Sequence, residues 1–129
     1  NVEIKVDSAE ALERFRADRD LTTRVLVNLL SNALKYAPPD SRITVQAFSF
    51  DEEQIGFAVS DEGPGIESTW ASRIFDQFAM VEAREAGAVG AGLGLHFCKM
   101  AVEAQGGDIW LDTEATTGTR IVFTLPKAL

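Results

Sequence analysis

The segment from Leu21 to Tyr36 constrains the fold of this chain most. Its apolar residues stand at positions 21, 25, 26, 29, 30, 33 and 34, which lie on one face of a helix. The next four residues, Ala-Pro-Pro-Asp at 37–40, end the helix because proline has no amide hydrogen to donate. We expect Asp20 to cap the first turn. One long amphipathic helix must therefore cover a core that other segments build.

A second stripe of the same helix is polar. Arg24, Asn28, Asn32 and Lys35 follow one another at spacings of four, four and three residues, which places them on one side of the helix. Amides and cations in line beside a buried face suit contacts to phosphates and a metal ion. A solvated surface explains this stripe equally well by itself, so its interpretation depends on the rest of the chain.

Most of the other patterned segments are rich in β-branched and alternating residues, which is typical of strands. The expected strands are residues 2–6, 43–50, 54–60, 108–113 and 119–125. An acidic turn at 51–53 predicts a hairpin between the second and third strands, and the last two should form a closing hairpin. Residues 8–18 fit either a short helix or a strand, and we favour a strand near 12–17.

Two further helices are expected, over residues 68–75 and 93–105, and Gly106-Gly107 should end the second. Residues 79–92 are rich in alanine and glycine, lack a clear period and predict a flexible loop. The expected fold class is α/β, a two-layer α/β sandwich. Its mixed, mainly antiparallel sheet would be covered on one face by three helices.

The size and net charge of the chain limit the classes of partner that it can bind. Its 129 residues fit a single domain, and a net charge of −8 argues against nucleic acid and anionic membranes, which both bind basic patches. An anionic ligand stays possible because local donors and a bound cation can outweigh a distant charge. A lone cysteine, Cys98, and a lone histidine, His96, exclude an internal disulfide and argue against a Cys/His zinc site.

The chain contains no signal peptide and no apolar run of membrane-spanning length. We therefore expect a cytoplasmic domain without direct membrane contact, within a parent protein that can itself be membrane-anchored. The chain begins abruptly in a strand-like segment without an initiator methionine. This beginning favours a single catalytic domain over residues 1–129 that is a fragment of a longer protein.

A carboxylate follows the expected strand 54–60. The apolar residues at 55, 57 and 59 share one face, and Asp61 has the same parity, so its side chain should point toward the buried side. A buried carboxylate needs hydrogen-bond donors, and an adenine amino group is a suitable one. Gly63 and Gly65 leave room for a flat ring beside it. An ordinary acidic turn is the alternative interpretation.

A second glycine-rich segment, Gly90-Ala91-Gly92-Leu93-Gly94-Leu95, opens the last expected helix. Free backbone amides at a helix start attract phosphate, and glycines let the backbone approach it. The spacing differs from a dinucleotide fingerprint, and no Gly-Lys-Ser/Thr follows as in a P-loop. Taken alone, a loop hinge explains the glycines as well as phosphate binding does.

The order of the motifs is more specific than any one of them. Asn28 and Asn32 come first, then Asp-x-Gly-x-Gly at 61–65, then Gly-x-Gly-Leu-Gly-Leu at 90–95. Ile-Phe-Asp-Gln-Phe at 74–78 and Gly-Thr at 118–119 complete the pattern. Together they resemble the ATP-binding catalytic domain of sensor histidine kinases, within the gyrase-type ATPase and kinase superfamily. The resemblance covers about residues 2–126 and implies a Bergerat-type fold with ATP between the helices and the sheet.

The resemblance implies a role for each polar residue at the phosphates. Asn32 would coordinate the Mg²⁺ that bridges them, Asn28 would contact the phosphate–metal cluster, and Lys35 would meet phosphate oxygens. These three are the expected catalytic residues. A single amide oxygen beside phosphate oxygens and waters suits Mg²⁺, which prefers hard oxygen ligands. The glycines that would end a mobile lid over the phosphates are Gly90, Gly92 and Gly94.

At the other end of the nucleotide, the resemblance implies that Asp61 accepts a hydrogen bond from the adenine amino group. A water held by Thr119 would help it. The remaining residues expected at the ATP site are Tyr36, Gly63, Gly65, Ile66, Phe78, Leu93 and Leu95. Relatives in this family usually carry a basic residue after the phenylalanine motif; here residues 79–81 read Ala-Met-Val, and Arg84 is the nearest candidate.

One substitution within the superfamily bears on mechanism. Relatives that hydrolyse ATP, such as gyrase, carry a glutamate where this chain has Asn28, and an amide cannot deprotonate water. The resemblance therefore implies that ATP is held until a histidine on a separate dimerisation domain of the same protein attacks its γ-phosphate. The phosphate then passes to the receiver domain of a response regulator. His96 lacks the His-Glu context of that histidine, so we expect the acceptor outside this chain.

Two other functions stay open at this point. The fold could serve as a nucleotide-binding interaction module without kinase activity, or as a serine kinase of the anti-sigma type. Intact Asn28, Asn32 and Asp61 favour catalysis over a degenerate module. The asparagine pair separates the two kinase branches less well.

Overall fold

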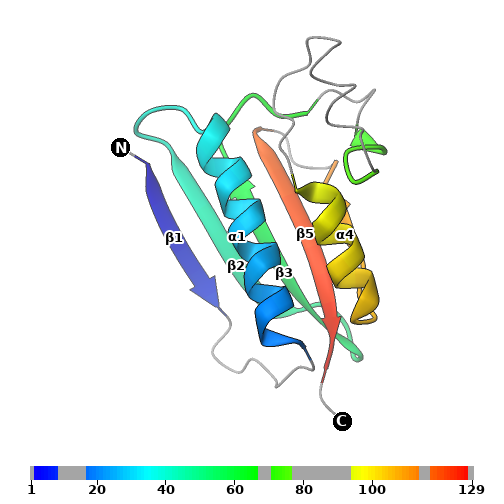
Figure 1. The fold of residues 1–129 in the computed structure, drawn as a ribbon. Coiled ribbons are helices and arrows are strands. Elements are labelled where there is room, and N and C mark those ends of the chain that lie inside the picture. Colours follow the sequence, from blue (N-terminus) through cyan, green and yellow to red (C-terminus); the bar gives the residue numbers. More distant parts are fainter. Residues whose placement is uncertain (1, 9–16, 67–70, 77–93, 114–116, 128–129) are drawn as a thin grey trace.

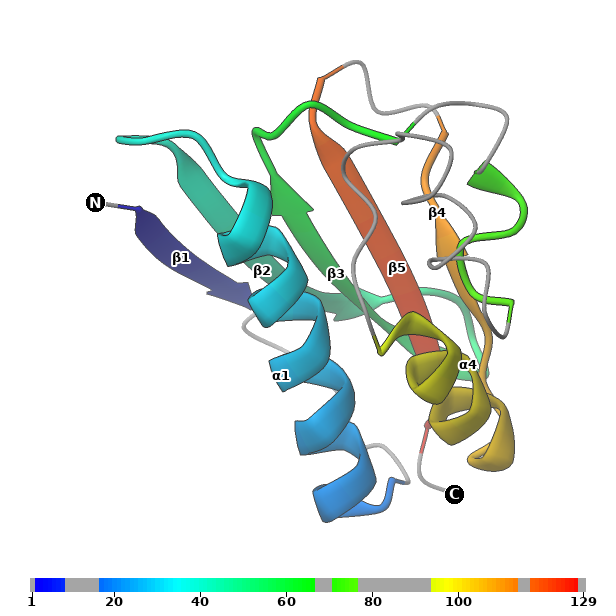
Figure 2. The same cartoon turned by 45° about the horizontal axis from the view of Figure 1, so that its top comes forward.

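The computed structural model describes residues 2–8, 17–66, 71–76, 94–113 and 117–127 (Figure 1). These residues form a five-stranded sheet with two helices on one of its faces, as the two views in Figures 1 and 2 show. In chain order the elements are β1 (Glu3–Ser8), α1 (Arg19–Tyr36), β2 (Arg42–Ser49), β3 (Gln54–Asp61), α4 (Leu95–Ala104), β4 (Ile109–Leu111) and β5 (Thr119–Pro126).

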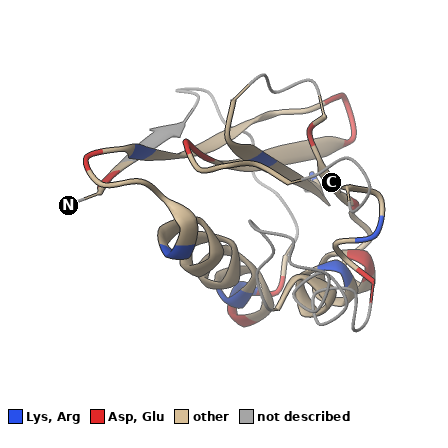
Figure 3. Ribbon diagram, turned by 90° about the horizontal axis from the view of Figure 1, so that it is seen from above, with Lys and Arg blue, Asp and Glu red and all other residues tan. Residues whose placement is uncertain are grey.

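The sheet has the strand order β1-β2-β3-β5-β4. Only the pairing of β1 with β2 is parallel among these neighbours, while β2–β3, β3–β5 and β4–β5 are antiparallel. The mixed, mainly antiparallel sheet and both expected hairpins are thus confirmed. Seen from above, the helices form one layer and the strands the other (Figure 3).

Some predicted boundaries were wrong. The cap of α1 is Asp18 rather than Asp20, and its side chain accepts a hydrogen bond from the amide of Leu21 at 3.0 Å. Asp20 lies in the first turn instead, where a negative charge favours the positive end of the helix dipole. The end of the helix is as predicted, at Tyr36 before the two prolines.

The helix expected over residues 68–75 is not among the described helices. Residues 68–70 lie outside the described residues, Ala71 is helical, and residues 72–76 form turns and a bend. The described residues therefore contain two of the three expected helices, α1 and α4. The strand favoured near 12–17 falls almost wholly outside the described residues, as does the loop expected over 79–92. Gly106 ends the α4 region as predicted, with a left-handed φ of 87°.

The core lies between the two layers. The alternation in β3 and β5 places Ile55 and Phe123 on the helix-facing side, both with no exposed surface, and Phe57 stacks on Phe123 with ring centroids 4.9 Å apart. The helices cover this face with their own buried residues, which are Thr22, Val25, Leu29 and Ala33 of α1 and Leu95, Cys98, Ala101 and Val102 of α4. Cys98 is a buried free cysteine.

A glutamine joins the two helices at one end. Gln105, just after α4, accepts a hydrogen bond from the backbone amide of Asp18 at 2.6 Å and donates one to the carbonyl of Ala101 at 3.1 Å. The start of α1 thus lies beside the end of α4. Because the helices run in opposite directions (Figure 1), the second half of α1 lies beside the start of α4. No helix in the described ranges has the length and apolar character to cross a bilayer.

The tight connection after α4 yields a stability prediction. A Cβ on Gly107 would lie 1.8 Å from the carbonyl oxygen of Thr124, whereas one on Gly106 would meet nothing nearer than Pro126 Cγ at 3.4 Å. Gly106→Ala should cost only its strained φ, about 1–2 kcal/mol. Gly107 has no positive φ, but Gly107→Ala must move the carbonyl of Thr124 in β5, so we expect a larger loss, more than about 2 kcal/mol.

Urea unfolding of both variants measures these losses. Equal destabilisation by the two substitutions would contradict the assigned contact between Gly107 and β5.

Candidate functional site

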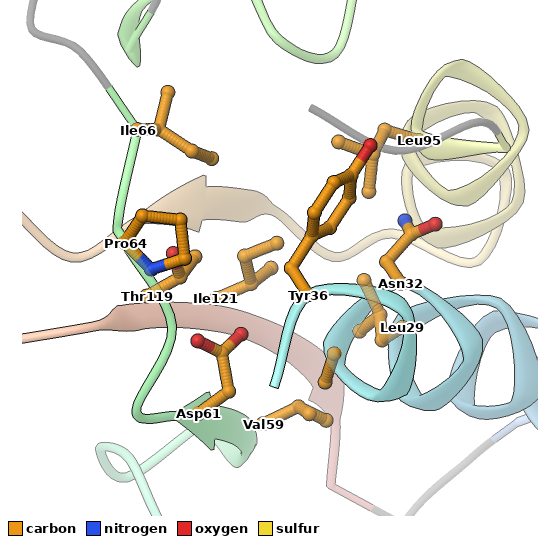
Figure 4. Close-up of a pocket in the computed structure, with 11 residues that line it drawn as sticks. Leu29, Asn32, Tyr36, Val59, Asp61, Pro64, Ile66, Leu95, Thr119 and Ile121 are labelled. Atoms are coloured by element: carbon orange, nitrogen blue, oxygen red, sulfur yellow. The ribbon is translucent and has the colours of Figure 1, made fainter. Parts of the chain in front are cut away.

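A pocket opens between the second half of α1, the ends of β3 and β5 that face it, and the start of α4 (Figure 4). Apolar side chains form much of its wall. Figure 4 shows Asp61 and Thr119 on one side and Asn32 on the other. The described residues that line the pocket are Leu29, Asn32, Ala33, Tyr36, Val59, Asp61, Pro64, Ile66, Leu95, Thr119 and Ile121.

Asp61 is the last residue of β3 and points into the pocket, as its parity predicted. Burial raises the pKa of its carboxyl, and backbone hydrogen bonds from Gly63 and Thr119 partly oppose that rise. The amide nitrogen of Gly63 lies 2.8 Å from Oδ1. The carboxylate is thus held in a fixed direction inside a partly apolar site, where a ligand N–H group can donate to it.

Three glycines let the backbone crowd around Asp61. A Cβ on Gly63 would lie 3.0 Å from the carbonyl oxygen of Tyr36, and one on Gly118 only 1.8 Å from that of Asp61. Gly65 has a φ of +79°, and a Cβ at this position would lie 3.1 Å from the carbonyl oxygen of Gly118. The turn after β3, the end of α1 and the start of β5 therefore meet closely around the Asp61 side chain.

Asn32 stands at the α1 side of the pocket. Its Nδ2 is buried and has no hydrogen-bond partner among the described residues. A buried polar atom without a hydrogen-bond partner is costly, so its presence here points to a ligand that accepts a hydrogen bond from Nδ2. The same side chain offers an amide oxygen, a ligand that Mg²⁺ accepts.

The donor set suits a metal held mainly by its substrate. In the ranges that the structure describes, no group of three or more His, Cys, Asp or Glu side chains could hold a metal ion. Mg²⁺ commonly takes one or two protein ligands and completes its shell with phosphate oxygens and water. Asn32, with Asn28 one helical turn before it, fits that pattern.

The polar stripe of α1 divides between two environments. The Asn28 amide packs against the first residue of the α4 region, since a Cβ on Gly94 would lie 3.2 Å from Asn28 Cγ. Lys35 is exposed, with Nζ 5.6 Å from the centre of the Tyr36 ring. Arg24 is exposed and lies over another ring, that of Phe97 on α4, at 4.4 Å. A solvated face thus describes Arg24 and Lys35, but not the two asparagines.

The structure gathers much of the predicted site. Six of the expected residues line the pocket, namely Asn32, Tyr36, Asp61, Ile66, Leu95 and Thr119. Four more lie in the segments around it, namely Asn28, Gly63, Gly65 and Gly94. Lys35 is near Tyr36 but is not a lining residue. Phe78, Gly90, Gly92, Leu93 and Arg84 lie outside the described residues.

Sequence reasoning missed five lining residues as site residues, namely Leu29, Ala33, Val59, Pro64 and Ile121. All but the proline belong to apolar faces that the sequence did predict. The pattern shows that a residue faces the interior, but not whether that part of the interior is filled core or the wall of a pocket.

His96 has a structural contact. Its Nδ1 lies 3.1 Å from the carbonyl oxygen of Phe75 and so ties the start of α4 to the turn at 71–76. This contact explains a partly buried histidine at this position without a role in phosphate transfer.

Known proteins resemble this chain throughout its length. A family model described as histidine kinase-, DNA gyrase B-, and HSP90-like ATPase matches residues 17–129. The sensor histidine kinase WalK of Bacillus subtilis is 46% identical over 114 residues, which are 84% of this chain and 18% of WalK. The adaptive-response sensory kinase SasA of Gloeothece citriformis is 36% identical over 126 residues, which are 98% of this chain and 32% of SasA.

Solved structures of other proteins also resemble the fold of this chain. Full-length ShkA in complex with AMPPNP has a TM-score of 0.81 and 28% identity, covering 98% of this chain and 26% of ShkA. The mycobacterial sensor histidine kinase MprB has a TM-score of 0.77 and 28% identity, over 98% of this chain and 82% of that one. The chain spans only 18% to 33% of the length of the first curated relatives.

The raised pKa of Asp61 predicts how stability depends on pH. Burial disfavours the ionised carboxyl in the folded protein, so its contribution to stability is full below the ordinary Asp pKa and is lost as pH rises through the folded pKa. Asp61→Asn removes the charge and keeps an oxygen that can accept from Gly63. We expect this variant, without ligand, to be at least as stable as the wild type at pH 7.5.

Urea unfolding of both proteins from pH 7.5 down to pH 3.5 measures the effect. The advantage of the variant should shrink as pH falls. A variant whose relative stability improves on acidification would contradict the assignment.

Proposed function

This chain belongs to the histidine kinase-, DNA gyrase B- and HSP90-like ATPase family, and from that membership we propose that it binds ATP with Mg²⁺ and donates the γ-phosphate to a histidine. That histidine would lie on the dimerisation domain of the same protein, and the phosphate would pass on to the receiver domain of a response regulator. The observation that carries the proposal is the pocket that joins Asn32 on α1 to Asp61 at the end of β3. Two relatives named as sensory kinases, WalK and SasA, support it.

At the base end, Asp61 would accept a hydrogen bond from the amino group of adenine. Its fixed direction, set by the amide of Gly63, favours one orientation of the base. Val59 and Ile121 lie beside it in the pocket wall and offer an apolar surface to the faces of a ring. A base with a carbonyl oxygen in place of the amino group would set two acceptors against each other, so the site should prefer adenine.

At the phosphate end, Asn32 and Asn28 would hold Mg²⁺ and the phosphates. When bound, the ion neutralises charge on the phosphate oxygens and aligns them for transfer. Lys35 is exposed near this end, and its flexible side chain would reach a phosphate oxygen. The start of α4, at Gly94 and Leu95, adds the positive end of a helix dipole.

The site is suited to hold ATP rather than hydrolyse it. Asp61 is the one carboxylate among the described residues that line the pocket, and it lies across the pocket from Asn32 (Figure 4). Neither asparagine amide can act as a general base toward water. Phosphate transfer would then wait for a nucleophile that a second domain brings.

The nucleotide contacts predict the effects of two substitutions. Asn32→Ala should lower Mg-ATP-dependent transfer at least about 100-fold, because metal and phosphates lose a positioning ligand. Asp61→Asn should weaken nucleotide binding about tenfold or more, because an amide accepts less strongly than a carboxylate and its NH₂ group can oppose that of adenine.

Calorimetry with ATP analogues and a transfer assay with the parent protein's dimerisation domain measure both effects. Thr23→Ala, on the exposed face of the same helix, is the control and should change neither. Wild-type affinity and transfer in both site variants would refute the assignment of the pocket.

The identity of the phosphate acceptor has its own test. Radiolabelled ATP is supplied to this chain together with the dimerisation domain, and the label on each protein is tested in acid and in base. Label on the added domain that is lost in acid and stable in base shows phosphohistidine, as proposed. Acid-stable label would instead indicate a serine kinase, and nucleotide binding without any label would indicate an interaction module.

A further inference from the structure

The pairing of β2 with β3 stops before β2 does. The paired residues nearest the pocket are Thr44 and Ser60. The same antiparallel register, continued by two residues on each strand, would set Arg42 opposite Glu62. Arg42 still belongs to β2, but β3 ends at Asp61 and Glu62 lies outside the strand. The first residue of β2 thus has no residue of β3 opposite it.

The side chain of Glu62 supplies an acceptor at this point. The carbonyl of Ser41 accepts from the amide of Glu3 at 3.0 Å, so the next amide of β2, that of Arg42, points the other way, toward β3. It donates to Oε1 of Glu62 at 2.5 Å. A side-chain oxygen here takes the place of a backbone carbonyl. The last bond between the two segments is therefore made although the backbone has already left the sheet.

The backbone that leaves the sheet forms one wall of the pocket. Figure 4 shows it running from Asp61 at the end of β3 past Pro64 to Ile66. The amide of Gly63 turns back and donates to Asp61 Oδ1 at 2.8 Å. Gly63 also passes close to the end of α1, where its Cβ would lie 3.0 Å from the carbonyl oxygen of Tyr36. A strand that continued along β2 would advance about 3.3 Å per residue and carry Gly63 away from both contacts.

We propose that Glu62 is a positioning residue that sets the direction of the Asp61 carboxylate, and hence the choice of base, by making the last bond to β2 with its side chain. The inference rests on the proposed function, because it takes Asp61 to accept from the amino group of adenine. Without an acceptor in this side chain, the Arg42 amide would turn to water or to the backbone carbonyl of position 62. The second partner extends β3 and draws Gly63 away from Asp61, so the carboxylate loses the bond that holds it.

The bond to Glu62 uses the backbone of Arg42 and not its charge. The guanidinium of Arg42 lies near Glu3 instead, with Nη2 3.5 Å from Oε2, and both side chains of that pair are more than half exposed. An exposed ion pair of this kind contributes little to stability. Removal of the Arg42 side chain should therefore leave the role of Glu62 unchanged.

Two substitutions separate the hydrogen bond of Glu62 from its charge and its packing. Glu62→Gln removes the charge and keeps an oxygen at the same distance from the backbone. Glu62→Met keeps the length of the side chain and offers no oxygen. A role of the charge alone predicts equal effects of the two variants, and a role in packing alone predicts that both are harmless.

The test measures base selectivity with inosine diphosphate (IDP), which has a carbonyl oxygen where adenine has its amino group. The quantity is the ratio of the Kd of IDP to the Kd of ADP, by calorimetry with Mg²⁺. Both nucleotides carry the same phosphates, so the ratio cancels any effect of Glu62 on phosphate or metal binding. Glu62→Met should lower this ratio at least about fivefold, because a hydrogen-bonding site discriminates through the direction of its acceptor. Glu62→Gln should keep most of the ratio.

Arg42→Ala and Glu53→Ala are the controls, and both should keep the wild-type ratio. The first removes the side chain beside the bond but retains the amide. The second removes an exposed glutamate from the turn at the other end of the same two strands. Thermal unfolding shows which variants are folded, and Glu62→Ala replaces Glu62→Met if methionine is not accommodated.

A wild-type ratio in Glu62→Met, even with a lower thermal stability, overturns the inference, because Glu62 would then serve the fold alone. An equal loss in Glu62→Gln overturns it as well, since the charge would be the cause, and so does a loss in either control. These outcomes leave the proposed function intact. A wild-type protein that binds neither nucleotide, or that does not prefer ADP, refutes the adenine contact of the proposed function itself.

Discussion

The burial of one face of α1 against the sheet is the interaction on which the rest of the structure depends. Val25 and Leu29 have at most 1% of their surface exposed, and they fix the rotation of the helix about its axis. Asn28 and Asn32, three residues further along, are then forced to the side that faces α4 and the pocket. A helix rotated by one residue would present these amides to solvent or bury them in the core.

The site keeps polar groups in an interior that disfavours them. Asp61 has a raised pKa because it is partly buried, and the Nδ2 atom of Asn32 has no hydrogen-bond partner among the described residues. Both are tolerable because the surrounding core is large, and Leu29 and Val59, which line the same pocket, are almost fully buried. Without a nucleotide, both groups lower the stability of the folded protein. A nucleotide that gave hydrogen-bond partners to both groups would therefore bind more favourably and stabilise the fold.

The contacts between α1 and α4 differ at the two ends of the helix pair. At one end, Gln105 bonds to the backbone of Asp18 and holds the helices together by polar contacts. At the other end, the helices meet where the Asn28 side chain of α1 packs against Gly94 before α4. Because the helices are antiparallel, the first contact sets the alignment in which the second can form.

The sequence by itself determined most of the described helices and strands and six of the eleven residues that line the pocket. The hydrophobic period gave the buried faces of α1 and β3, and parity alone placed Asp61 on the buried side. Such patterns are local, so neighbours along the chain suffice to find them. They placed the cap at Asp20, which was wrong, because Asp18 is an equally good capping residue and is the cap in the structure. That choice coincides with a bond from Gln105, 87 residues away. Only the tertiary structure decided which apolar residues line the pocket and that Asn28 packs against Gly94, because these contacts arise from packing between segments far apart in the chain.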